Sequence, residues 1–165
     1  RKELAHYVEV GGTLIIDAAG GSGEFAMAAE RELQAMFPEA IGQGGQLHRN
    51  IPLGDRLYSA NGIKLAEVGY RTFARKTLAG STAGSHLRAI EIKGRRAVFF
   101  SAEDLSTGLV GQQVDGVVGY DPRSATMLME DMLLTAGNLG PATRPAPPAP
   151  PSATLPSPSS QPAGK

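Results

Sequence analysis

Along residues 1–140, the spacing of apolar positions alternates between the period of a helix and that of a strand. The first predicted helix has three apolar residues on one face: Leu4, Tyr7 and Val8. It ends at the glycine pair Gly11-Gly12. The next segment, 13–16, is a short apolar run rich in β-branched residues, which predicts a strand covered on both faces. Asp17 closes this strand.

A second helix is predicted between the glycine-rich segment 18–23 and Pro38, which stops it. Its apolar positions follow the helical period: Phe25, Ala29, Leu33, Met36 and Phe37. Residues 39–85 show no clear period, apart from a short element at 70–75.

Two further segments predict a β-hairpin, because 87–92 alternate with period two and 97–101 form a second apolar strand after a turn at 93–96. Asp121-Pro122 then predicts a helix start, with Asp121 as N-cap and Pro122 in the first turn. The buried stripe of this helix, which ends at Gly137, is predicted to consist of Ala125, Leu128, Met129, Met132, Leu133 and Ala136.

This order of elements predicts an α/β fold of the flavodoxin-like, doubly wound kind, with helices on both faces of the sheet. Ligands of such folds bind beyond the carboxyl ends of the strands, so the residues after Ile16 and Phe100 are the candidates for a site. We expect one domain over residues 1–140. Residues 141–165 hold nine of the twelve prolines and predict a disordered proline-rich tail.

Composition removes several classes of function. The 16 basic and 16 acidic side chains cancel, so bulk charge does not favour nucleic acid or an anionic membrane. No apolar run approaches the roughly 20 residues that span a bilayer. Cysteine is absent, which excludes disulfides, thiolate metal sites and a cysteine nucleophile. Because the chain starts Arg1-Lys2-Glu3, we expect it to be part of a larger protein.

Over roughly residues 1–138, the chain resembles the bacterial family known as domain of unknown function 4159. The most specific segments are GGTLIID with its glycine turn and FSAEDLS. The resemblance implies the carboxyl end of a larger protein and a fold similar to class I glutamine amidotransferase domains, which are flavodoxin-like. Those enzymes use a Cys-His-Glu triad. Since this chain has no cysteine, the resemblance implies the fold and leaves the activity open.

The glycine turn is a candidate for holding a small anion on its backbone amides: Gly20, Gly21, Ser22 and Gly23. It matches no nucleotide-binding fingerprint, and the alternative is a tight turn in which Ser22 caps the following helix. Asp17, at the end of its strand, is a candidate base, nucleophile or ligand. The alternative for Asp17 is a carboxylate that accepts hydrogen bonds from the glycine-turn amides.

Ser101, Glu103 and Asp104 follow the other apolar strand and are expected near Asp17. Such carboxylates would suit Mg²⁺ or Ca²⁺, but Ser-x-x-Asp is equally a local capping motif, and we predict no metal and no cofactor.

The three histidines are scattered along the chain: His6, His48 and His86. No nucleophile-elbow motif supports a catalytic triad on Ser101. A basic cluster around Tyr70 and Phe73 indicates either an acidic partner or a solvated face: Arg71, Arg75, Lys76 and Arg88.

Three functions remain open. The first is a non-catalytic ligand- or partner-binding domain of a larger, envelope-associated bacterial protein, with other domains of that protein or a small anionic ligand as partners. The second is a hydrolase or transferase that uses Asp17, Ser101 and Asp104 at the strand ends. The third is a purely structural role, which predicts an extended apolar surface in place of a pocket.

Overall fold

The computed structural model describes residues 1–42, 46–112 and 114–137, so the predicted tail 141–165 lies outside the described residues. Within this part of the chain, the protein is a mixed α/β structure of three strands and six α-helices. None of the described helices is long and apolar enough to cross a membrane.

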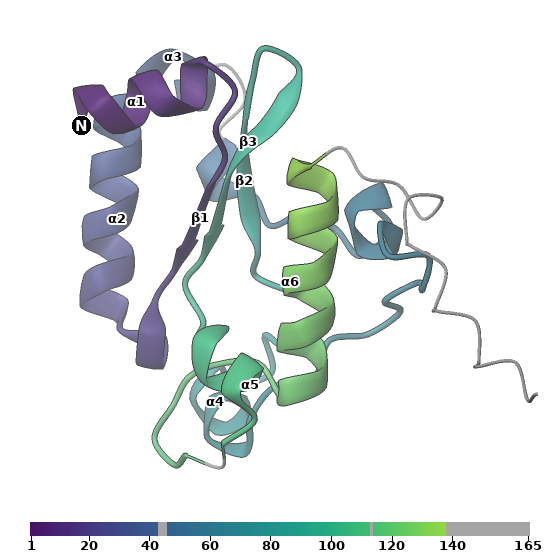
Figure 1. Ribbon diagram of the computed structural model, residues 1–165. Coiled ribbons are helices and arrows are strands. Elements are labelled where there is room, and N and C mark those ends of the chain that lie inside the picture. Colours follow the sequence, from purple (N-terminus) through teal and green to yellow (C-terminus); the bar gives the residue numbers. More distant parts are fainter. Residues whose placement is uncertain (43–45, 113, 138–165) are drawn as a thin grey trace, which may run out of the picture.

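The sheet has the order β1-β3-β2, with β1 at Leu14–Asp17, β2 at Arg88–Ile92 and β3 at Arg95–Ser101. The central strand β3 runs parallel to β1 and antiparallel to β2 (Figure 1). Residues 97–101 of β3 are completely buried because strands lie on both sides of β3 and helices cover both of its faces. The two apolar strands β1 and β3 pair side by side, which brings Ser101 next to Asp17 as expected from the sequence.

The predicted hairpin between β2 and β3 is confirmed, and its turn is shorter than expected. Only Lys93 and Gly94 form it, both with positive φ, at 53° and 75°. This backbone is typical of the two-residue turns whose twist matches that of the flanking strands. Arg95 pairs with Ile92 and so belongs to β3. Its Nη2 donates to the carbonyls of Val8 and Gly12, which ties the hairpin to the segment before β1.

Helices cover the sheet from two sides (Figure 1). On one face lie α1 (Lys2–Glu9), α2 (Gly23–Met36) and α3 (Pro38–Gly42), whose apolar residues pack with Val98 and Phe100. On the other face lies α6 (Pro122–Ala136), which packs with Phe99. Two shorter helices, α4 (Thr72–Thr77) and α5 (Ser106–Val110), lie near the carboxyl ends of β1 and β3.

Several predicted apolar stripes are placed differently in the structure. Leu4, Tyr7, Phe25 and Leu133 are 47–55% exposed, whereas α6 buries the polar residues Ser124 and Asp131. Both faces of β1 pack against the core as expected, Ile15 on the side of α6 and Leu14 and Ile16 on the other side. The strand is nevertheless only half-buried, because it lies at the edge of the sheet. The element predicted at 70–75 is the start of α4, and Pro38 not only ends α2 but also starts α3.

The predicted cap of α6 is present, since Asp121 Oδ1 accepts a hydrogen bond of 2.7 Å from the Ser124 amide. We expect Asp121→Ala to lower the free energy of unfolding by about 1 kcal/mol, because one helix amide loses its acceptor. Chemical denaturation measures this change. Asp115→Ala, which removes an exposed carboxylate, is the matched control, and an equal loss in both variants would contradict the capping role.

Candidate functional site

The strand ends predicted to form a site do meet at one rim. Asp17 and Ser101 are register partners in the parallel pair, and Asp104 follows three residues later. We call these three residues the strand-end rim. It lies between the glycine turn and α5 at the carboxyl ends of β1 and β3 (Figure 1).

Each polar group of the rim is bound by the protein's own chain. Asp17 Oδ1 and Oδ2 accept hydrogen bonds of 2.8 and 3.0 Å from the amides of Leu105 and Ser106, at the start of α5. Ser101 Oγ is buried and donates to the Glu103 carbonyl at 2.6 Å. These contacts favour a structural role for both residues. The partners of Asp17 differ from the expected ones, because its carboxylate holds the start of α5 by charge-assisted bonds and does not accept from the glycine-turn amides.

Asp104 connects the two segments that flank the rim, the glycine turn and α5. Its buried carboxylate accepts hydrogen bonds from the Gly20 amide, from the Thr107 amide at 2.8 Å and from Thr107 Oγ1 at 3.0 Å. Asp104 therefore binds the glycine turn to α5. In the part of the chain that the structure describes, no group of three or more His, Asp or Glu side chains is placed to hold a metal ion.

The polar groups of the glycine turn also make their hydrogen bonds within the protein. Ser22 caps α2 by accepting a hydrogen bond from the Phe25 amide at 3.3 Å, and the Gly20 amide is taken by Asp104. Gly21 packs so closely that a Cβ there would lie 2.2 Å from the Val118 carbonyl oxygen. These contacts favour the capped turn over the predicted anion site.

Gly20 and Gly21 provide a matched pair to test this packing, because both have a φ near +70°. Alanine at either position strains the left-handed backbone, at about 1 kcal/mol. Only Gly21→Ala also meets Val118, whereas Gly20 faces open space. We expect Gly21→Ala to destabilise the protein by about 2 kcal/mol more than Gly20→Ala in thermal or urea unfolding. Equal losses would show that the close approach is unimportant.

Glu103 was expected near Asp17, but it does not join the rim and instead pairs with His86. His86 Nδ1 lies 2.6 Å from Glu103 Oε1, and His86 Nε2 lies 3.2 Å from Ser81 Oγ. Glu103 is 5% exposed, and its carboxylate raises the pKa of His86 above 6.5. We call Ser81, His86 and Glu103 the Ser81 site. No motif in the sequence marks this site, since its members are spread over 23 residues, from an aperiodic segment to the residues that follow a strand.

Buried tyrosines hold the loop 81–87 that carries this site. Tyr120 Oη accepts a hydrogen bond of 3.1 Å from the His86 amide, and Tyr70 Oη donates to the Gly84 carbonyl at 2.7 Å. Tyr58 Oη donates to the Ile51 carbonyl at 3.0 Å and contacts Ser85 Oγ. Burial raises the pKa of all three phenols, that of Tyr58 to about 12, so they stay neutral and available as donors.

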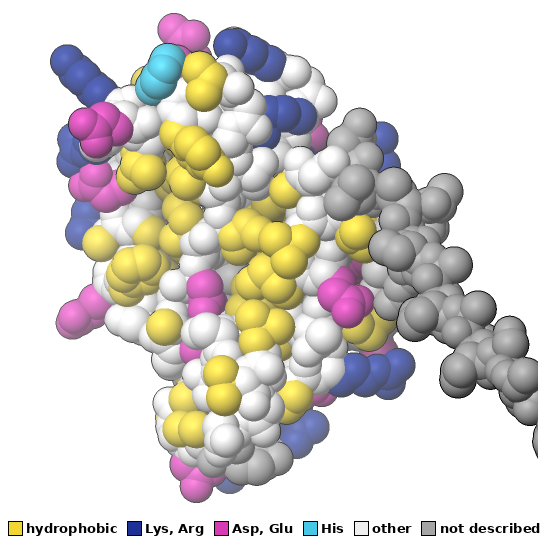
Figure 2. All heavy atoms as spheres, in the orientation of Figure 1, with side chains coloured by type: hydrophobic (Ala, Val, Ile, Leu, Met, Phe, Trp, Pro, Cys, Tyr) yellow, Lys and Arg dark blue, Asp and Glu magenta, His cyan; other side chains and the backbone are white. Residues whose placement is uncertain are grey.

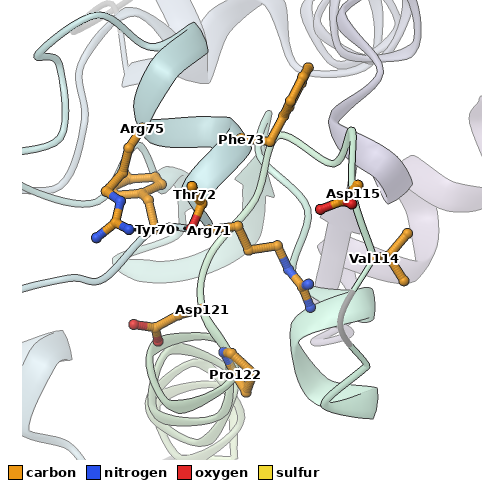
Figure 3. A pocket seen from close by; sticks show the side chains of 9 residues that line it. All are labelled: Tyr70, Arg71, Thr72, Phe73, Arg75, Val114, Asp115, Asp121 and Pro122. Carbon is orange, nitrogen blue, oxygen red and sulfur yellow. Dashed lines mark hydrogen bonds between the residues drawn. The ribbon is translucent and has the colours of Figure 1, made fainter.

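Two hollows lie near these elements. An open hollow of about 340 Å³ is lined by residues 50–53 together with Ser81, residues 83–85 and His86. A second hollow, of about 280 Å³, lies between α4, the segment around Asp115 and the start of α6 (Figure 3). Of the basic residues predicted to cluster around Tyr70 and Phe73, Arg71 and Arg75 line this second hollow, and Arg71 donates to the Thr107 and Gln112 carbonyls. Arg88 lies on β2, away from this hollow, and pairs with Glu30 at 2.7 Å.

The His86–Glu103 pair makes stability depend on pH. Because folding raises the pKa of His86, the pair stabilises the protein fully below the ordinary pKa of 6.5 and loses this contribution as the pH rises through the raised value. We therefore expect the stability difference between wild type and Glu103→Gln to shrink as the pH increases through this range. Thermal melts across pH measure it, with the exposed Glu67→Gln as control. A difference that grows with pH would contradict the assignment.

Comparison with known proteins gives one family match. The model of the family described as "Domain of unknown function (DUF4159)" matches residues 1–130, which is most of the chain. No curated protein and no solved structure matches the chain.

Proposed function

Because the chain belongs to the DUF4159 family, whose description names no activity, we propose its function from its own geometry: a partner-binding α/β domain of a larger bacterial protein. The observation that carries the proposal is the open edge of β1. The partner that fits this edge is an extended segment from another domain of the same larger protein, which adds to the sheet as a further strand.

Backbone groups point outward along this edge. The Ala18 amide donates to the Ser101 carbonyl, so the alternation of a strand turns the backbone groups of Ile15 and Asp17 away from β3. No strand of the described residues pairs with β1 on that side. Parallel strands are ordinarily covered by further strands and helices, so a free parallel edge favours strand addition.

The surface around the edge is apolar enough for such a partner. Figure 2 shows apolar side chains gathered in a band over α1, β1 and α6. Residues 14–16 of β1 are apolar yet only partly buried. The helices on either side carry large exposed apolar residues: Leu4, Tyr7, Phe25, Met27 and Leu133. Apolar surface that would become buried supplies the main driving force for association.

The rim favours a role without catalysis at the strand ends. Asp17, Ser101 and Asp104 make their hydrogen bonds to the protein itself, so the hydrolase or transferase alternative on these residues has less support. The predicted small anionic ligand also has less support, because the Gly20 amide already donates a hydrogen bond to the Asp104 carboxylate.

Two finer assignments belong to the same proposal. A sheet with helices on both faces and a parallel β1–β3 pair is consistent with a flavodoxin-like fold of the class I glutamine amidotransferase type, in which further strands would follow β1. The absence of cysteine supports a relative of those domains without their chemistry. We further propose residues 1–140 as the domain, residues 141–165 as a tether, and an envelope-associated parent protein.

Proline at position 15 tests strand addition, since it removes the outward amide and is tolerated on edge strands. Linear peptides selected from a random display library on the wild-type protein are the probe. We expect alternating apolar sequences whose affinity falls about tenfold or more with Ile15→Pro and is kept with Ile15→Val. Leu133→Lys, at a 55% exposed site, tests the flanking surface in a variant that leaves the core intact.

Two results would overturn the proposal. One is selected peptides that bind Ile15→Pro as well as wild type while its circular dichroism spectrum is unchanged. The other is a selection that enriches no peptide on the wild-type protein.

A further inference from the structure

We propose that Ser81, His86 and Glu103 form a second, separate functional centre, which hydrolyses esters of short apolar acids with Ser81 as nucleophile. This activity goes beyond the proposed partner binding and involves neither the β1 edge nor the strand-end rim.

The three side chains follow the order of a nucleophile, a base and an orienting carboxylate. Ser81 Oγ is 3.2 Å from His86 Nε2, and His86 Nδ1 is 2.6 Å from Glu103 Oε1. With Nδ1–H donated to Glu103, Nε2 is the nitrogen left to accept the Ser81 proton. This is the relation by which a hydroxyl is activated in acyl transfer on unrelated folds.

The surrounding protein fixes this arrangement. Glu103 is 5% exposed, and the His86 backbone is held by Tyr120, so neither the carboxylate nor the imidazole is on a free surface loop. Ser81 follows a turn in which Ala79 and Gly80 both have positive φ, at 46° and 93°. A non-glycine residue in this region is strained, and such strain is concentrated at functional sites.

An open hollow beside Ser81 and His86 has an apolar wall against which a small acyl group fits. Its volume is about 340 Å³, and its apolar wall is made by Ile51, Pro52, Leu53 and Ala83. Ala83 and Gly84 also line it, and their backbone amides donate to no other described residue. We assign these amides as the donors to the oxyanion that forms in the reaction.

The chemistry needs only water as co-reactant. Ser81 Oγ attacks the ester carbonyl carbon while its proton passes to His86 Nε2. The tetrahedral intermediate collapses, the C–O bond to the alcohol breaks, and His86 returns the proton to the departing oxygen. Water then attacks the acyl-serine, giving one proton to His86, and release of the acid restores the Ser81 hydroxyl with that proton.

His86 acts as a base only when neutral, so the rate is expected to rise with pH through its pKa. The groups facing it are Glu103 from the end of β3, Arg88 from β2, and the phenols of Tyr70 and Tyr120. Glu103→Gln removes the neighbouring negative charge and should shift the midpoint of this pH profile downward. A merely structural role of Glu103 would not move the midpoint.

A fluorophosphonate probe and p-nitrophenyl acetate, applied to the full chain, test the centre. We expect the probe on the peptide containing Ser81, by mass spectrometry, and a loss of roughly 100-fold or more in labelling and hydrolysis with Ser81→Ala or His86→Asn. Ser59→Ala, at an exposed serine far along the chain, is the matched control and should change neither. Ser81 is exposed, so its truncation leaves the fold intact.

The outcomes separate this proposal from the previous one. Wild-type labelling at several serines with equal rates, or labelling and hydrolysis unchanged by Ser81→Ala, would overturn the acyl-transfer centre. Ile15→Pro should leave labelling of Ser81 unchanged, and Ser81→Ala should leave peptide binding unchanged. Failure of one experiment therefore leaves the other interpretable.

Discussion

The parallel pairing of β1 with β3 is the constraint on which the rest of the structure depends. It places Asp17 beside Ser101 and leads both strands into the same end of the molecule. From there, Asp17 and Asp104 hold the start of α5 and the glycine turn, and the segment after β3 delivers Glu103 to His86. A one-residue slip of this register would turn the core residues of β3 to the opposite faces and separate the carboxylates from the amides that they bind.

The sequence was sufficient to predict those elements whose signal lies in neighbouring residues. The hairpin, the Asp121 cap and the apolar character of β1 and β3 follow from alternation, turn residues and a Pro at the helix start. The edge position of β1 was not predictable from its residues. An apolar run is expected for a strand inside a sheet, and equally for an edge strand whose free side is covered by a partner. Helix α5 was missed because STGLV lacks a helical period and is held by caps from distant residues.

The candidate chemistry divides in the same way. The sequence predicted that Ser101, Glu103 and Asp104 would lie near Asp17. The structure places Ser101 and Asp104 at one rim with Asp17, whereas Glu103 pairs with His86. The sequence left open whether carboxylates at a strand end bind a ligand or accept hydrogen bonds from nearby backbone amides, since the two roles use the same residue types. The pairing of His86 with Glu103 and Ser81 depends on the loop 81–87 and on three buried tyrosines, so no spacing along the chain could have indicated it.

The placement of these tyrosines has a spectroscopic consequence. The chain contains no tryptophan and four tyrosines, so its near-ultraviolet signal comes mainly from phenol rings. Three of the four are buried around loop 81–87, and the rings of Tyr70 and Tyr120 lie 4.9 Å apart. The asymmetric, fixed surroundings of these rings make near-ultraviolet circular dichroism a built-in reporter of order in this loop, without any attached label.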